Sequence, residues 1–223
     1  MSVTVTANLQ ELLSDITPES PKVFYGVKWE DYVEFTKKTL DQTDLELTYN
    51  RGVLRVNMGI GLRHENLSRF LHNLITLVAL QLNLSIIPAG SMSLVSNKVR
   101  KGADPDESYY IENSQVVGLR NRLFDEERDI PPDLVVEIDQ SHKSDEKFEI
   151  YASFGVKEFW LYDEELLHIF LLNKTGEYLE AENSLAFPVL SSKYLTQILK
   201  RSQIEEQFKV LQDFQNWLAE QKK

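Results

Sequence analysis

One short apolar segment constrains the fold more than any other part of the chain. The segment PPDLVVEID places Glu137 inside a run of Leu, Val and Ile that predicts a buried strand. Side chains alternate along a strand, so Glu137 and Asp139 share one face. A buried ionised carboxylate is unfavourable without a partner. A positive partner is therefore expected, and in a chain with no cysteine this is a hard divalent metal ion or a lysine.

A second acid lies directly before another predicted strand. The segment KGADPDESYYI places Asp106 just before residues that predict this strand. If the two strands are antiparallel neighbours, Asp106 lies beside Glu137 or Asp139. Asp133 lies about 13 Å along its strand from Glu137 and belongs at the far end. The spacing therefore predicts a carboxylate cluster of Asp106, Glu137 and Asp139.

Lys147 follows in the next predicted helix, which begins near Asp145 and ends at Gly155. Its ammonium can reach back over the carboxylates. Carboxylates and a lysine beside a metal-bound water suit phosphodiester hydrolysis, because the metal polarises the phosphate and the lysine stabilises negative charge. The alternative stays open that the acids are solvated strand ends and that Lys147 is an exposed helix charge.

Three segments of the chain, KGADPDESYYI, PDLVVEID and KFEIYASFGVKEFWLYD, together resemble the Uma-type restriction endonuclease family of the PD-(D/E)xK nuclease superfamily. The resemblance covers about residues 29–172, and the three segments occur in the family's order. It implies a central sheet flanked by helices and a magnesium-dependent phosphodiesterase site.

The resemblance also assigns roles to single residues. Asp106 takes the place of the first aspartate of the superfamily motif, and Glu137 that of the acid in its second half. Asp139 stands where the motif lysine is usual, which leaves Lys147 as the replacement. Glu65 on a long helix resembles the acid that completes the metal site in many relatives. A helix N-terminal charge favoured by the dipole is the alternative for Glu65.

Two further polar residues near the expected site have lower ranks. Glu46 alternates with the apolar Leu45 and Leu47 in a predicted hairpin, and it is a third-rank metal ligand. His64 lacks metal-ligand spacing to the other histidines, so we expect polar scaffolding there rather than a ligand. The predicted metal ligands are thus Asp106, Glu137, Asp139 and Glu65.

Strands placed before, between and after helices predict an α/β fold with a mixed central β-sheet flanked by helices. We expect a restriction-endonuclease-like core with an N-terminal hairpin and a C-terminal helix. The predicted organisation is a flexible N-terminal arm at 1–25 with a short helix at Leu9–Ile16, a single domain at 26–200, and an amphipathic helix at 201–223.

The charge of the chain limits how it can meet nucleic acid. A net charge of −11 counts against a non-specific nucleic-acid binder, although it permits a locally basic groove. We expect such a groove around Lys98, Arg100, Lys101 and Lys143. The predicted function is a metal-dependent endonuclease that hydrolyses nucleic acid, above all DNA, with Mg²⁺ or a substituting Mn²⁺. The alternative is a catalytically inactive nuclease-fold binding or regulatory module, because the motif lysine is missing.

Location and assembly are predicted from composition and periodicity. The absence of cysteine fits a reducing cytosol, no signal peptide is visible, and the most apolar helix, near Leu67–Leu82, is too polar to span a bilayer. We therefore expect a cytoplasmic protein without membrane association. A homodimer is expected as well, paired through apolar residues of the C-terminal helix: Ile204, Phe208, Leu211, Phe214 and Leu218.

Overall fold

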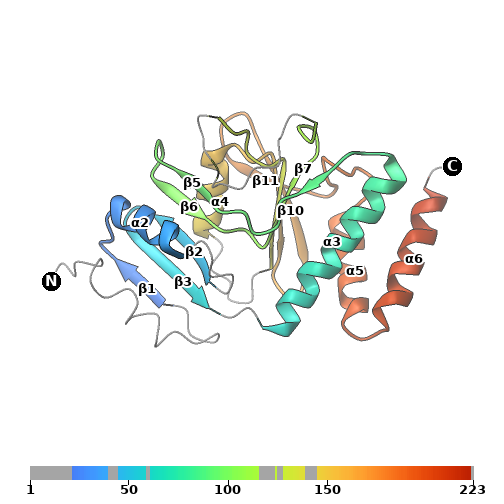
Figure 1. Ribbon diagram of the computed structural model, residues 1–223. Coiled ribbons are helices and arrows are strands. Elements are labelled where there is room, and N and C mark those ends of the chain that lie inside the picture. The colour runs from blue at the N-terminus through green and yellow to red at the C-terminus, as the bar shows by residue number, and fades with distance from the viewer. Residues whose placement is uncertain are drawn as a thin grey trace.

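The computed structural model describes residues 22–39, 45–58, 61–115, 124, 128–138 and 145–221. Within these residues the chain forms two β-sheets with helices around them (Figure 1). The first sheet has five antiparallel strands in the order β1-β3-β2-β6-β5. Their bounds are Lys22–Tyr25 for β1, Leu45–Asn50 for β2, Val53–Met58 for β3, Leu94–Ser96 for β5 and Lys101–Ala103 for β6.

The second sheet has six strands in the order β11-β10-β9-β8-β7-β4. Their bounds are Ile87–Pro88 for β4, Glu107–Tyr110 for β7, Leu134–Ile138 for β8, Glu158–Tyr162 for β9, Leu167–Leu172 for β10 and Tyr178–Ala181 for β11. The pair β8–β9 is parallel and the other neighbours are antiparallel, so this sheet is mixed. The antiparallel pairing of β7 with β8, with Glu107 opposite Val136, confirms the pairing expected of these strands.

Helices cover both faces of the six-stranded sheet. The helices on this sheet are α3 at Leu62–Leu82, α4 at Asp145–Phe154, α5 at Ser192–Ser202 and α6 at Gln207–Glu220, whereas α2 at Trp29–Thr39 packs on the first sheet. Leu134, Val136 and Ile138 of β8 lie in one core with the apolar residues of α3, α5 and α6. Val135 lies in a different core with residues of α4. Glu137 alternates with Val136 and therefore lies on the α4 face.

The first sheet packs one face against α2 and turns the other towards α4. Leu47 and Tyr49 of β2 share a core with Trp29, Tyr32 and other residues of α2. The alternate residues of β2 lie on the opposite face, where the Asn50 side chain donates to Glu149 of α4 at 3.0 Å. Helix α4 therefore lies between the polar face of the first sheet and the second sheet (Figure 1).

The prediction of a mixed α/β fold with a central sheet is confirmed by the six-stranded sheet. The predicted hairpin is also confirmed, since β2 and β3 pair around Arg51 and Gly52, which both have positive φ. The hairpin does not extend the central sheet, however, because β2 pairs with β6 to build a second sheet. Residues 22–25, which the sequence places in the N-terminal arm, form β1 and pair with β3. The short helix expected at Leu9–Ile16 lies outside the described residues.

The C-terminal helix belongs to the core of the molecule. Val210, Phe214 and Leu218 of α6 are buried in the core that α3 and the six-stranded sheet share. The expected dimer surface is therefore wrong for Phe214 and Leu218, because their side chains already pack within the chain. Ile204 and Phe208 remain exposed, at 85% and 65%. Among the described residues, no helix is long and apolar enough to cross a bilayer.

Candidate metal centre

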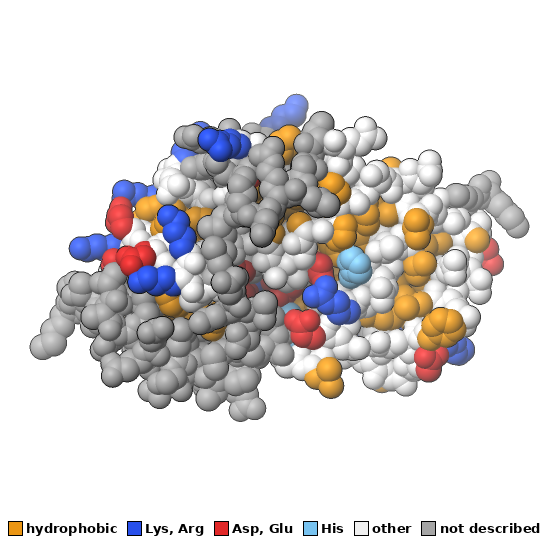
Figure 2. Space-filling model, viewed as in Figure 1, with side chains coloured by type: hydrophobic (Ala, Val, Ile, Leu, Met, Phe, Trp, Pro, Cys, Tyr) orange, Lys and Arg blue, Asp and Glu red, His pale blue; other side chains and the backbone are white. Residues whose placement is uncertain are grey.

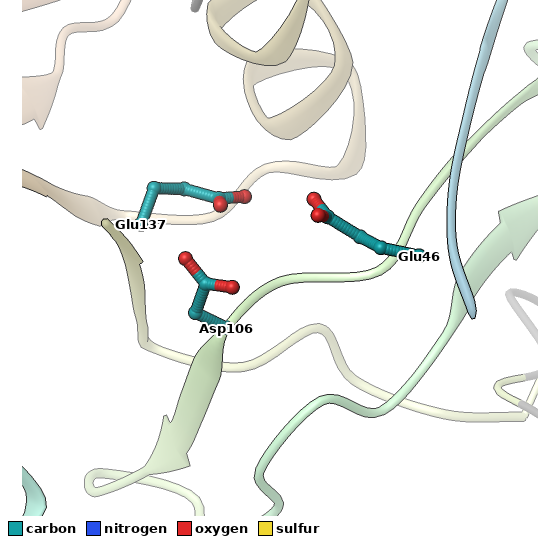
Figure 3. A group of neighbouring side chains, drawn as sticks. All are labelled: Glu46, Asp106 and Glu137. Atoms are coloured by element: carbon teal, nitrogen blue, oxygen red, sulfur yellow. The ribbon is translucent and has the colours of Figure 1, made fainter. Parts of the chain in front are cut away.

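Three carboxylates from three parts of the chain meet between the two sheets (Figure 3). Glu46 comes from β2, Asp106 precedes β7, and Glu137 lies in β8. One oxygen from each lies within 4.8 Å of one oxygen from each of the others. Carboxylate oxygens at this spacing suit a hard divalent cation such as Mg²⁺ or Mn²⁺. The residues present therefore fit the metal that the sequence predicts.

The strand pairing positions Asp106. The backbone N–H of Ile138 donates to Oδ2 of Asp106 at 2.6 Å, and Nε2 of His64 lies 3.2 Å from the same oxygen. Burial raises the pKa of the Asp106 carboxyl, but the His64 hydrogen bond and the Lys147 charge outweigh it and leave this pKa below its ordinary value. Asp106 is thus held as an anion within a nearly closed environment.

His64 joins α3 to both strands of the site. Its Nε2 lies 2.9 Å from the carbonyl oxygen of Ile138, and because a carbonyl only accepts, Nε2 carries the proton. Burial lowers the pKa of His64, whereas Asp106 and Glu46 raise it, and the net direction is upward. The sequence predicts scaffolding for this histidine, and its contacts agree with that role.

Glu137 is buried, and two side chains of α4 donate to it. Lys147 Nζ donates to Oε2 at 2.5 Å, and the Tyr151 hydroxyl donates to Oε1. Lys147 and Tyr151 are four residues apart on α4, so they lie on the same helix face. Burial raises the pKa of Glu137 well above its ordinary value, with Lys147 opposing the rise while Asp106 and Glu46 add to it.

Lys147 bridges two of the three acids. Besides its contact with Glu137, its ammonium donates to Oε1 of Glu46 at 2.8 Å, while Asn57 donates to Oε2 of Glu46 at 3.1 Å. Burial lowers the pKa of Lys147, but the charges of Glu137, Glu46 and Asp106 outweigh it, so its pKa lies well above the ordinary value. Lys147 is therefore an ammonium ion among the carboxylates, as the reach of its helix predicts.

Ion pairs brace α4 against the first sheet. Glu146 forms a two-point contact with Arg55 of β3 at 2.9 and 3.0 Å. Glu149 accepts from Arg51 at 2.6 Å and from Lys101 at 2.9 Å. These contacts hold the helix that carries Lys147 over the hairpin that carries Glu46, so they fix parts of the site that are distant in the sequence.

The ranking of the acids from the sequence changes in two respects. Glu46, ranked third, lies inside the cluster, whereas Glu65 does not belong to the group found among the described residues. The Glu65 side chain is 44% exposed and lies 3.8 Å from Arg69 on the same helix. The helix-dipole interpretation therefore describes Glu65 better than the ligand interpretation. Asp139 lies outside the described residues, so its assignment stays a prediction.

Two contacts were not anticipated. The Tyr151 hydroxyl donates to Glu137, and its spacing of four residues from Lys147 is the signal for this contact in the sequence. Asn57, which donates to Glu46, stands opposite it in the hairpin register. Asp133 lies at the other end of β8, as expected, where it accepts from the backbone N–H of Ile111 at 2.7 Å.

The sequence predicts a basic groove at Lys98, Arg100, Lys101 and Lys143. At two of these four positions, Arg100 and Lys101, the cation pairs with an acid. Lys101 pairs with Glu149 at 2.9 Å and is only 12% exposed, and Arg100 lies 3.4 Å from Glu30. Lys143 lies outside the described residues. Positive and negative side chains are interspersed on the visible surface near α2 (Figure 2). Acids therefore pair with the cations at these two positions of the expected groove.

Comparison with known families decides the membership of the chain. The model of the Uma2 family, described as "Putative restriction endonuclease", matches residues 29–198. The chain belongs to this family. The resemblance stated from the three segments is therefore confirmed, and the match extends past α4 and β9 into α5. No curated protein matches the chain.

Membership in the Uma2 family supports a nuclease function in general and implies a nucleic-acid substrate. Restriction-endonuclease-like proteins generally use divalent metals, and the buried group of Glu46, Asp106 and Glu137 can bind one. The two sheets and their helices are consistent with a restriction-endonuclease-like fold.

Proposed function

We propose that this Uma2 protein is a metal-dependent endonuclease that hydrolyses phosphodiester bonds of DNA, with Mg²⁺ as the metal and Mn²⁺ as a substitute. The observation that carries the proposal is the meeting of three carboxylates with the ammonium of Lys147. Family membership supplies the class of substrate. Glu46, Asp106 and Glu137 are the proposed metal ligands. When bound, the ion would polarise the phosphate and lower the pKa of the attacking water.

The protein residues have distinct tasks in this proposal. Asp106 is held as an anion by Ile138 and His64, so it offers a fixed negative oxygen to the ion. Lys147 remains protonated and can stabilise the negative charge that develops on the phosphate oxygens. Asp139 is a further candidate ligand, since it follows Glu137 by two positions in the sequence.

The biological setting is part of the proposal. We place the protein in the cytoplasm, because a chain with no cysteine suits a reducing compartment. A homodimer would bring two sites to the two strands of a duplex, and symmetric pairing is the commonest form of assembly. Exposed Ile204 and Phe208 are the residues of the expected pairing surface that remain available for it.

A second function, an inactive binding or regulatory module, is favoured by a specific observation. The cations expected to line a groove are partly neutralised by acids, as in the pairs Lys101–Glu149 and Arg100–Glu30. Aspartate also stands at position 139, where the motif lysine is usual. Such a module would bind nucleic acid or a protein without hydrolysis.

Cleavage of supercoiled plasmid separates the two functions. Wild type, Asp106→Ala, Glu137→Ala and Lys147→Ala are compared with Mg²⁺, Mn²⁺ or EDTA. The endonuclease proposal expects metal-dependent nicking by the wild type that the Asp106 and Glu137 variants lose. Retained nicking by Lys147→Ala would remove that residue alone from the mechanism. A folded wild type that binds plasmid but never nicks it, with either metal, would favour the inactive module.

A further inference from the structure

The hydrogen bonds of the acids show which oxygens are already engaged. Both oxygens of Glu137 accept from α4, Oε2 from Lys147 at 2.5 Å and Oε1 from Tyr151. Both oxygens of Glu46 accept as well, Oε1 from Lys147 at 2.8 Å and Oε2 from Asn57 at 3.1 Å. Lys147 is thus the charged donor that Glu46 and Glu137 have in common.

A lysine in this place and a divalent ion are electrostatic competitors. The ammonium lies between the same carboxylates that a metal ion would use as ligands. If the same oxygens contacted both cations, the ammonium and the divalent ion would lie close together and repel each other. Water screens this repulsion little, because the side chains of Glu137 and Lys147 are only 1% and 15% exposed. The neutral donors Tyr151 and Asn57 do not carry this penalty. Metal binding therefore disfavours the contacts of Lys147 with Glu46 and Glu137 most.

We propose that Lys147 is the counter-cation of the carboxylates before metal binds, and that a divalent ion displaces its ammonium from Glu137. This inference rests on the proposed function, because it concerns the same metal centre. The lysine keeps the buried acids from repelling one another, and metal takes over this task. The long flexible stem of the lysine allows its ammonium to move while α4 stays in place. Its release then leaves the charge available to the phosphate of the substrate.

Metal affinity without nucleic acid tests the exchange. Binding of Mn²⁺ is measured by electron paramagnetic resonance for wild type, Lys147→Met and the control Lys157→Met. Lys157 is a matched lysine, since it also pairs with acids, Glu112 and Asp133, but at the far end of the sheet. We expect Lys147→Met to bind Mn²⁺ about tenfold more tightly, the size of an ordinary coupling between two ligands, and Lys157→Met to match the wild type. Equal or weaker binding by Lys147→Met overturns the exchange.

Thermal unfolding gives a second readout. In EDTA, Lys147→Met should unfold at a lower temperature than wild type, and saturating Mn²⁺ should raise its midpoint by more than that of wild type. If Lys147→Met folds only with Mn²⁺, the counter-cation role is supported. The comparison is repeated with Lys147→Gln, which is neutral but polar. If Mn²⁺ raises the unfolding midpoint of both variants by no more than that of wild type, the proposal is contradicted.

The failure of the exchange and of the proposed function can be told apart. Asp106→Asn in the Lys147→Met background should lose the tight Mn²⁺ binding, which assigns the ion to the carboxylate cluster. If neither wild type nor the Lys147 variants bind Mn²⁺, the metal centre itself fails and the exchange fails with it. If wild type binds Mn²⁺ and Lys147→Met binds it no more tightly, the exchange alone fails.

Discussion

The backbone N–H of Ile138 donates to Oδ2 of Asp106 at 2.6 Å, so the residue that follows Glu137 orients the first acid of the cluster. The antiparallel pairing of β7 with β8 brings the two positions together. His64 closes the arrangement by contacting both Asp106 and the carbonyl of Ile138. The relative placement of Asp106 and Glu137 is therefore set by strand pairing.

Removal of the His64 contact should weaken the site without removing a ligand. We expect His64→Ala to lower Mn²⁺ affinity and the rate of plasmid nicking by about 10–100-fold, the usual effect of losing a group that orients a metal ligand. His168→Ala is the control, because His168 contacts Glu180 and Asp163 away from the cluster. Equal values for the two variants would show that His64 does not position Asp106.

Loss of the Tyr151 hydroxyl should reduce stability. Tyr151 is fully buried and donates to Glu137, so Tyr151→Phe leaves a buried carboxylate oxygen without this donor. We expect the free energy of unfolding to fall by about 1–3 kcal/mol in urea denaturation. Tyr25→Phe, at a side chain that is 78% exposed, should change it little. A Tyr151→Phe protein as stable as this control would contradict the assigned hydrogen bond.

Glu158 should make stability depend on pH. Burial raises the pKa of Glu158 above its ordinary value of 4.5, although Trp160 and the backbone of Ala186 donate to it. The unfolded chain then releases this proton at lower pH than the folded chain, so stability falls as pH rises from about 4.5 through the folded pKa. Glu158→Gln removes this loss.

The measurement is the free energy of unfolding of wild type and Glu158→Gln from about pH 4 to about pH 7, a range that begins near the ordinary pKa of a glutamate. Relative to the variant, wild type should become less stable as pH rises. A difference between the two proteins that stays constant with pH would exclude the raised pKa as a source of the pH dependence.

Gly102 should be required by the packing of α2 on the first sheet. A Cβ at position 102 would lie 2.0 Å from the hydroxyl oxygen of Tyr32, whose side chain is fully buried. We expect Gly102→Ala to lower the free energy of unfolding by about 1–3 kcal/mol through overpacking. Gly61→Ala, with open space around the added carbon, is the control for the overlap, and its smaller loss should reflect only the N-cap position of Gly61 in α3. Similar losses for both variants would contradict the packing argument.

The local elements could be predicted from the sequence because their signals are short-range. The apolar residues of β8 and the periodic face of α3 each lie within one segment, and these segments form the strand Leu134–Ile138 and the helix Leu62–Leu82. The neighbouring positions of Asp106 and Glu137 followed from a single assumption, that their strands are antiparallel, which the structure confirms. Lys147 was found because its helix starts directly beyond the strand that carries Glu137.

The position of Glu46 beside Asp106 and Glu137 could not be predicted, because it depends on contacts between segments far apart in the chain. Glu46 reaches the site only because β2 pairs with β6 and lies against α4. No periodicity within the hairpin reports that pairing. Glu65 gave the stronger local signal, at the start of a helix, yet its side chain is partly exposed and lies beside Arg69. The division into two sheets was missed for the same reason.

The comparison of Glu46→Gln with Glu65→Gln tests the central claim most directly, because it sets the acid placed in the cluster against the acid that the sequence favoured. The measurement is Mg²⁺-dependent nicking of supercoiled plasmid by wild type and both variants. A metal-dependent nuclease centred on Glu46, Asp106 and Glu137 predicts at least about a 100-fold loss for Glu46→Gln and a rate near that of wild type for Glu65→Gln. A loss confined to Glu65→Gln, or a wild type that does not nick with Mg²⁺, would contradict it.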